Sequence, residues 1–182
     1  SEVERLAEEL RKHVEEIKKE LRKLKEKLEK LARDIERELK RLRDENKKHA
    51  DDIRDKVEKR KTDEKTIEDL IRDHERLSEE TKKRIEDLIR RLEELLREVA
   101  KRIKELIEDH RRLLKDVADK IEDKDTLRRI EEEVKKSERE LREELKRLEE
   151  RVRRVIEKLE DLLRRIEKEN EEVKRDLERR RK

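Results

Sequence analysis

Four histidines are the side chains of this sequence best suited to chemistry: His13, His49, His74 and His110. An imidazole can bind a metal ion, transfer a proton or respond to pH near neutrality, and it can activate a neighbouring serine as a nucleophile. The chain has no cysteine, so it has neither disulfide nor thiolate chemistry. Which of these reactions is open to the histidines depends on the elements that position them.

A repeat of eighteen residues indicates what those elements are. Aliphatic residues recur at this spacing in sets that share one slot: Val3, Leu21, Leu39 and Val57; Ile67, Ile85, Ile103 and Ile121; Leu127, Leu145 and Leu163. Eighteen residues complete five turns at 3.6 residues per turn, whereas a heptad repeat would impose a left-handed supercoil. The repeat therefore predicts straight α-helices.

The composition agrees with helices and excludes several classes of function. Charged residues make up 64% of the 182 residues, but the 60 basic and 57 acidic residues are interspersed and leave a net charge of only +3. Such patterning favours pairs on helix surfaces, for example Glu93 with Arg97 and Glu143 with Arg147. Without glycine there is no phosphate-binding loop, and without aromatic residues there is no stacking platform for nucleic acid.

Two interruptions divide the repeat into three parts. The aliphatic pattern stops after Val57 and again after Ile121, and in both places a threonine or aspartate suited to capping follows lysines. We predict turns near 61–63 and 123–125. The predicted fold is all-α, an elongated, straight antiparallel three-helix bundle with the 18-residue core repeat and helices about 90 Å long. Residues 1–182 are expected to form a single domain with helices over about 2–60, 64–122 and 126–181.

Short turns also predict how the helices are aligned. Residue numbers on the first and second helices should add up to about 124, and the third helix should follow the first by about 124 residues. Polar residues that occupy aliphatic slots then meet in two groups: His13, His110 and Ser137; and His49, His74, Asn46, Ser78, Asn170 and Thr81. We interpret both groups as buried, hydrogen-bonded structural layers that fix the helix register.

Metal binding and catalysis are alternatives for the same residues. Zinc takes four ligands, and the matching positions of the third helix offer Ser137 and Val173 instead of a cysteine or a carboxylate. Ser137 near two histidines lacks a substrate cleft and an oxyanion donor. We therefore predict that the chain is not an enzyme and has no catalytic residue, cofactor or metal site. Burial alone lowers the pKa of a histidine, so we predict weaker stability near about pH 4–5 than near about pH 7.5.

With the repeat and the polar layers combined, the whole chain resembles parametrically designed, untwisted three-helix bundles with buried hydrogen-bond networks. The resemblance implies a stable, monomeric structural scaffold without natural activity. Two alternatives stay open: a designed pH-responsive or His-pair metal-binding bundle, and a spectrin-like structural or membrane-associated coiled-coil protein. We expect no partner, nucleic acid or membrane. Since no apolar run approaches the roughly 20 residues of a membrane span and no signal peptide is present, the sequence predicts a soluble protein.

Overall fold

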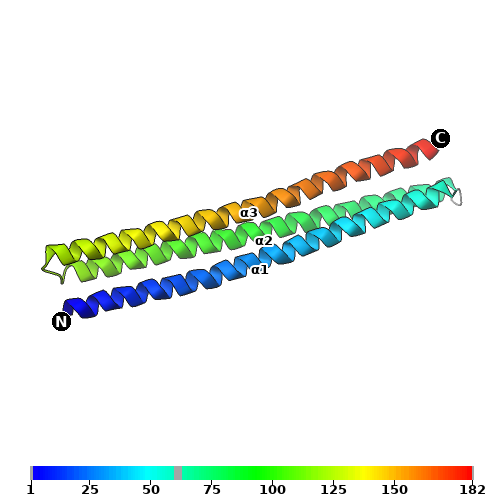
Figure 1. The fold of residues 1–182 in the computed structure, drawn as a ribbon. Helices are drawn as coiled ribbons and strands as arrows, with labels where there is room; N and C mark the ends of the chain where they lie inside the picture. Colours follow the sequence, from blue (N-terminus) through cyan, green and yellow to red (C-terminus); the bar gives the residue numbers. More distant parts are fainter. Residues whose placement is uncertain (1, 60–62, 182) are drawn as a thin grey trace. The chain divides into compact units, whose positions relative to one another are not determined.

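Three long α-helices make up nearly all of the described chain in the computed structural model (Figure 1). The structure describes residues 2–59 and 63–181. The helices are α1 (Glu2–Glu58), α2 (Glu64–Ala118) and α3 (Lys124–Arg181). Since these residues contain no strand, the prediction of an all-α three-helix bundle is confirmed.

Both helices that follow a loop begin at an aspartate that caps them. Asp63 accepts a hydrogen bond from the backbone N–H of Thr66 at 2.9 Å. Asp123 accepts one from the Thr126 hydroxyl at 2.7 Å and one from the backbone N–H of Asp125 at 3.2 Å. These bonds satisfy N–H groups that have no partner inside the helix. Hydrogen bonds from the threonines also lower the pKa of both aspartates, which therefore stay charged at the positive end of each helix dipole.

The end of α2 corrects a prediction. The helix was expected to continue to about residue 122 with a turn at 123–125, but it ends at Ala118 and the loop covers 119–123. Beyond this point the N–H groups of Lys120 and Ile121 bond to carbonyls three residues back, at 3.1 and 3.3 Å, which tightens the chain into a 3₁₀-like turn. Of the other predicted turn, residues 61 and 62 lie outside the described residues.

Ile121 explains why the repeat misplaced this boundary. It occupies the same slot as Ile67, Ile85 and Ile103, and like them it is buried, with 7% of its surface exposed. It packs against Val117 from the loop instead of from the helix. An apolar residue that covers a core from a loop can keep the spacing of the helix before it, so periodicity alone could not separate the two cases.

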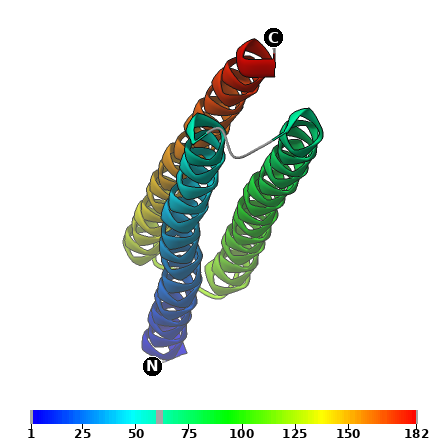
Figure 2. The ribbon, with the colours of Figure 1, turned by 90° about the vertical axis from the view of Figure 1, so that its right-hand side faces the viewer.

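The chain divides into two compact units, and each unit contains one segment of every helix. Unit 1 comprises Ser1–Lys30 and Glu93–Val152, and unit 2 comprises Leu31–Leu92 and Arg153–Lys182. Within each unit the α2 segment runs antiparallel to the segments of α1 and α3, as the colours of Figure 1 and Figure 2 show. The expected single domain over residues 1–182 stays a prediction.

Aliphatic side chains fill the interior of each unit. A cluster in unit 1 consists of Leu10, Val117, Ile121, Ile130 and Val134, with Leu113, Leu114 and Leu127 packed against it. A cluster in unit 2 consists of Ala50, Ile53, Val57, Ile67, Val173 and Leu177, with Leu70 and Ile71 packed against it. None of the large hydrophobic side chains that the structure describes is exposed. Over the same residues, no helix is long and apolar enough to cross a membrane.

Candidate functional site: the buried polar residues

The two histidines of unit 1 contact each other across α1 and α2. Nδ1 of His13 lies 3.3 Å from Nδ1 of His110, and the ring planes are tilted by 46°. His110 is almost fully buried, with 1% of its surface exposed, whereas His13 is half-buried. An N–H···N hydrogen bond needs one protonated Nδ1 that faces an unprotonated one, so the neutral pair holds a single proton between its two facing nitrogens.

Unit 2 contains an equivalent pair. Nδ1 of His49 lies 3.0 Å from Nδ1 of His74, and the two rings are nearly parallel, at 4°. His74 is 3% exposed and His49 is half-buried. In both pairs the more buried histidine belongs to α2, and its outer nitrogen, Nε2, has no hydrogen-bond partner in the protein. Of the contacts expected from the aligned residue numbers, those between the paired histidines are present in both units.

Burial controls the protonation of the two α2 histidines. Desolvation lowers the pKa of His74 below its ordinary 6.5; His49 and Arg54 act in the same direction, and the Asn170 side chain opposes them. Desolvation also lowers the pKa of His110, and His13 adds to the effect while Glu138 opposes it. Both rings are therefore neutral at pH 7, as an N–H···N contact requires.

A second polar contact in unit 2 connects α3 to α2. The Asn170 amide Nδ2 donates a hydrogen bond to the hydroxyl of Ser78. That hydroxyl in turn donates to the backbone carbonyl of His74 at 2.7 Å. Asn170, Ser78 and His74 thus form a chain of hydrogen bonds, and two of these residues lie ninety-two positions apart in the sequence.

Three other residues predicted for these layers form no hydrogen bond between helices within the described chain. Asn46 is 2% exposed, yet neither atom of its carboxamide has a hydrogen-bond partner. The Thr81 hydroxyl donates to the carbonyl of Leu77 in its own helix at 2.9 Å. Ser137 is 9% exposed, and no hydrogen bond joins it to either histidine of unit 1 within the described chain. Residues at the same level of a bundle can point in different directions, and a hydroxyl can donate its hydrogen bond to a carbonyl in the preceding turn of its own helix.

A buried carboxylate of unit 1 was missed by the sequence analysis. Glu138 is 9% exposed and accepts two hydrogen bonds from Arg111, from Nε at 2.8 Å and from Nη2 at 3.1 Å. This bidentate pair joins α3 to α2 and lowers the pKa of Glu138 against the opposing effect of burial. Glu138 is one of 57 acidic residues in the chain and lies at the edge of the apolar stripe of its helix, so its type and position did not indicate that it is buried.

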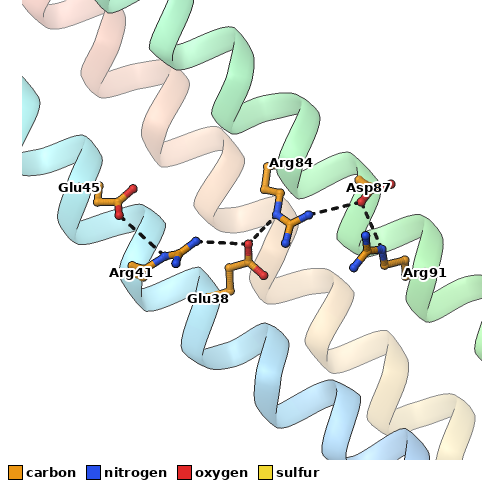
Figure 3. A network of polar contacts seen from close by, with 6 residues as sticks. All are labelled: Glu38, Arg41, Glu45, Arg84, Asp87 and Arg91. Atoms are coloured by element: carbon orange, nitrogen blue, oxygen red, sulfur yellow. Dashed lines mark hydrogen bonds and ion pairs between the residues drawn. The ribbon is translucent and has the colours of Figure 1, made fainter.

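Ion pairs on the surface connect the helices and follow the same repeat. In unit 2, Glu38 of α1 contacts Arg84 of α2, and further charges extend the group, as Figure 3 shows: Arg41, Glu45, Asp87 and Arg91. In unit 1, Glu20 and Arg102 form the corresponding pair. Each of these two pairs lies eighteen residues from the other along both helices.

Pairs between α1 and α3 give the register of those helices. Arg151 follows its partner Glu29 by 122 residues in unit 1. In unit 2, Lys158 with Glu36 and Asp176 with Arg54 have the same separation. The register is therefore the same in the two units and differs by about half a turn from the predicted offset of about 124.

The described residues include no group of three or more His, Cys, Asp or Glu side chains that could hold a metal ion. Each histidine pair brings two nitrogens into contact with each other instead of arranging them around a common point. A zinc ion would need further ligands, which the neighbouring aliphatic slots do not supply.

No protein-family model matches the chain, and no curated protein matches it. One solved structure that is similar to it is described as "Computationally designed three helix bundle". The two chains share 20% sequence identity over 99% of this chain and 86% of the other, with a TM-score of 0.45. The three-helix architecture described above rests on the helices of this chain itself.

Proposed function

We propose that this chain is a designed structural scaffold in which buried polar residues select one helix register. One observation carries the proposal: an otherwise aliphatic repeat is interrupted by polar residues, and interruptions on different helices contact each other. His13 contacts His110, His49 contacts His74, and Ser78 contacts Asn170. The absence of Gly, Pro, Cys, Met, Trp, Tyr and Phe and the regular spacing of eighteen residues support a designed origin.

A perfect repeat has a specific weakness that polar interruptions can correct. If α1 slipped by one repeat, aliphatic slots would again face aliphatic slots. The surface between α1 and α2 would not resist such a slip either, because Glu38 with Arg84 and Glu20 with Arg102 occupy equivalent slots. A slip in one direction would bring Glu38 to Arg102, and a slip in the other would bring Glu20 to Arg84. Where the two helices still overlap, core contacts and surface charge between them therefore do not distinguish these registers, although the repeat that slides past the end loses its core contacts.

The histidine pairs do distinguish them. A slip of one repeat in either direction would place His13 or His49 opposite Leu92, which is fully buried. A buried imidazole that loses its hydrogen-bond partner costs about 1–3 kcal/mol. The polar residues thus lower the stability of competing registers more than they raise that of the native one.

Cysteine cross-linking can test this role, since the chain has no cysteine of its own. A flexible Gly/Ser linker of about thirty residues, inserted between Lys59 and Asp63, would reach about 30 Å and free α1 for a slip of about 27 Å. In this background Glu38→Cys with Arg84→Cys reports the native register. The matched pair Glu38→Cys with Arg102→Cys reports a slip of one repeat. A short bifunctional maleimide reagent then traps whichever pair is close.

We expect the native cross-link alone while the histidines are present. Replacing all four by leucine, the residue that lies between them in the repeat on both helices, should make the slipped cross-link appear. If the leucine variant gave only the native cross-link, the buried histidines would have no role in the register. Far-UV circular dichroism of both variants would establish that each is folded.

A further inference from the structure

Ion pairs between α1 and α3 reverse their signs from one repeat to the next. In unit 2, a carboxylate oxygen of Glu36 on α1 lies 4.0 Å from Nζ of Lys158 on α3. Eighteen residues further along both helices the base is on α1 and the acid is on α3: Nε of Arg54 lies 3.8 Å from a carboxylate oxygen of Asp176. Adjacent repeats therefore carry opposite charges in the same slot of each helix.

The repeat before Glu36 and Lys158 continues this alternation. Its slots hold Lys18 on α1 and Glu140 on α3, and these two residues line the same cavity of unit 1. The signs along α1 thus run basic, acidic, basic, and those along α3 run acidic, basic, acidic. We call these three pairs the first row of charges: Lys18 with Glu140, Glu36 with Lys158, and Arg54 with Asp176.

A second row of charges alternates in the same way. Its middle pair is Glu29 with Arg151 in unit 1, in which the paired atoms are 3.3 Å apart and both side chains are half-buried. The slots one repeat earlier and one repeat later carry the reverse arrangement, with a basic residue on α1 and an acidic residue on α3: Arg11 with Glu133, and Lys47 with Glu169.

The surface between α1 and α2 follows the same repeat without alternation. Glu38 with Arg84 and Glu20 with Arg102 both place the acid on α1. The eighteen-residue repeat therefore does not by itself produce a reversal of sign. The reversal is a separate property of the surface between α1 and α3.

We propose that the two rows of charges determine which register of α3 the surface of α1 accepts. This inference rests on the proposed function of the chain as a scaffold with one selected register, and it extends that selection to the third helix. The hydrogen bonds within the histidine pairs join α1 to α2, so they do not by themselves fix the position of α3.

A slip of α3 by one repeat would bring like charges together in both rows. In one direction the facing residues would be these pairs: Lys18 with Lys158, Glu36 with Asp176, Arg11 with Arg151, and Glu29 with Glu169. The other direction would give these: Glu36 with Glu140, Arg54 with Lys158, Glu29 with Glu133, and Lys47 with Arg151. Like charges placed opposite each other disfavour a pairing. A slip of two repeats would restore opposite signs but keep only one pair in each row.

A flexible linker can free α3 for such a slip in the full chain. A Gly/Ser segment of about thirty residues, inserted between Ile121 and Glu122, would reach about 30 Å, whereas a slip of one repeat moves the helix by about 27 Å. Asn170→Val restores the residue of the equivalent slots at Val134 and Val152, and it removes the hydrogen bond that also connects α3 to α2.

Two cysteine pairs report the register in this parent protein. Lys25 and Arg147 line one cavity between α1 and α3, so Lys25→Cys with Arg147→Cys reports the native register. Arg165 occupies the same slot one repeat later, so Lys25→Cys with Arg165→Cys reports a slip. A short bifunctional maleimide reagent traps the pair that is close, and we expect the native cross-link to predominate strongly in the parent.

Exchanging the charges of the two middle pairs removes the alternation without changing the composition. The variant carries Glu29→Lys, Glu36→Lys, Arg151→Glu and Lys158→Glu. Every native pair of both rows stays opposite in sign, but α1 is now basic and α3 acidic throughout, so the slipped register also places opposite charges together. We expect the ratio of slipped to native cross-link to rise about tenfold. Without the linker, the urea midpoint of the exchanged chain should equal that of the original chain.

A matched control exchanges a pair on the other surface. Glu20→Arg with Arg102→Glu keeps an opposite pair between α1 and α2 and should leave the cross-links of α3 unchanged. Salt gives a second control, because about 1 M NaCl screens charges beyond about 3 Å and should raise the slipped cross-link in the parent more than in the exchanged variant.

A slipped cross-link that is already abundant in the parent, or one that does not increase in the exchanged variant, would overturn the proposal. All four histidines stay in place throughout, so either result would leave their role in aligning α1 with α2 unaffected. The same rows of charges oppose a slip of α1. The leucine variant described above should therefore show more of its slipped cross-link once the charges of the two middle pairs are exchanged.

Discussion

The buried polar residues of this protein differ in how well they are satisfied, and their energetic roles differ accordingly. The two histidine pairs share a proton between facing Nδ1 atoms, and Ser78 both accepts and donates a hydrogen bond. Asn46 is as deeply buried as His74 but has no partner at all. A satisfied group can specify structure at little cost, whereas an unsatisfied one only lowers stability.

Acidification should destabilise the protein through His74 and His110. Their pKa values in the folded chain lie below 6.5, so the unfolded chain binds more protons at pH values between the folded pKa and 6.5. Their contribution to stability is fully present above about pH 6.5 and is lost as the pH falls through the folded pKa values. We expect a lower urea midpoint at about pH 5 than at about pH 7.5.

A variant with His74→Leu and His110→Leu is the control for this pH dependence. Its urea midpoint should change less between the two pH values, because leucine does not titrate. Carboxylates such as Glu138 titrate below their ordinary 4.5 and therefore contribute in a lower range. An unchanged pH dependence in the double variant would assign the effect to other groups.

Replacing Asn46 should stabilise the protein. Leucine occupies the equivalent slots at Leu10 and Leu28, and both of these side chains are buried. Removing two unpartnered polar atoms from the interior should raise the free energy of unfolding by about 1–3 kcal/mol. Urea denaturation of Asn46→Leu measures this gain. Asn46→Ala should show a smaller gain or a loss because it leaves a cavity, and a destabilised Asn46→Leu would indicate that the carboxamide has a partner.

At the scale of the elements, helix ends and the ion pairs along each helix surface were the least predictable features. The capping aspartates were visible as sequence signals, but the end of α2 was not, because Ile121 keeps the periodicity of the helix from within the loop. The surface ion pairs agree with the prediction only in part: Glu93 pairs with Arg97 as predicted, whereas Arg147 contacts Glu144 instead of Glu143. With charges on every turn, several partners are within reach and their energies differ little.

Removing a capping aspartate should loosen the first turn of its helix. In Asp63→Ala the backbone N–H of Thr66 loses its hydrogen-bond acceptor. In Asp123→Ala the backbone N–H of Asp125 loses its acceptor. Amide hydrogen exchange in the first turn of the affected helix should become several-fold faster, while exchange in the middle of the helices should not change. Asp63→Ser retains a capping oxygen and should exchange like the original chain. Identical exchange in the alanine and serine variants would rule out a capping role.

At the scale of the whole molecule, two compact units share three continuous helices. Residues 30–31 lie inside α1, residues 92–93 inside α2 and residues 152–153 inside α3. Helix formation is cooperative along a continuous segment, so loss of structure in one unit should reach the other through the backbone itself. The single domain predicted for residues 1–182 is a statement about this cooperativity.

Matched core substitutions can measure the folding cooperativity between the two units. Ile85 in unit 2 and Ile103 in unit 1 occupy the same slot of α2 and are 0% and 1% exposed. Either Ile→Ala change should cost about 2–5 kcal/mol, and each should lower the stability of both units equally. Hydrogen exchange followed by mass spectrometry would show this as equal loss of protection in peptides from unit 1 and unit 2. Loss confined to the substituted unit would mean that the units unfold separately.

The sequence by itself determined the helical class, the number of helices, the aliphatic core and the alignment that brings the histidines into pairs. All of these follow from periodicity and chain connectivity, which are linear properties of a sequence. Only the tertiary structure decided which polar atoms find partners: Ser78 and Asn170 do, Asn46 does not, and Glu138 is buried against Arg111. A hydrogen bond requires its two atoms to be positioned within a fraction of an ångström and to point toward each other. Residue spacing places a side chain only to within about half a turn of helix.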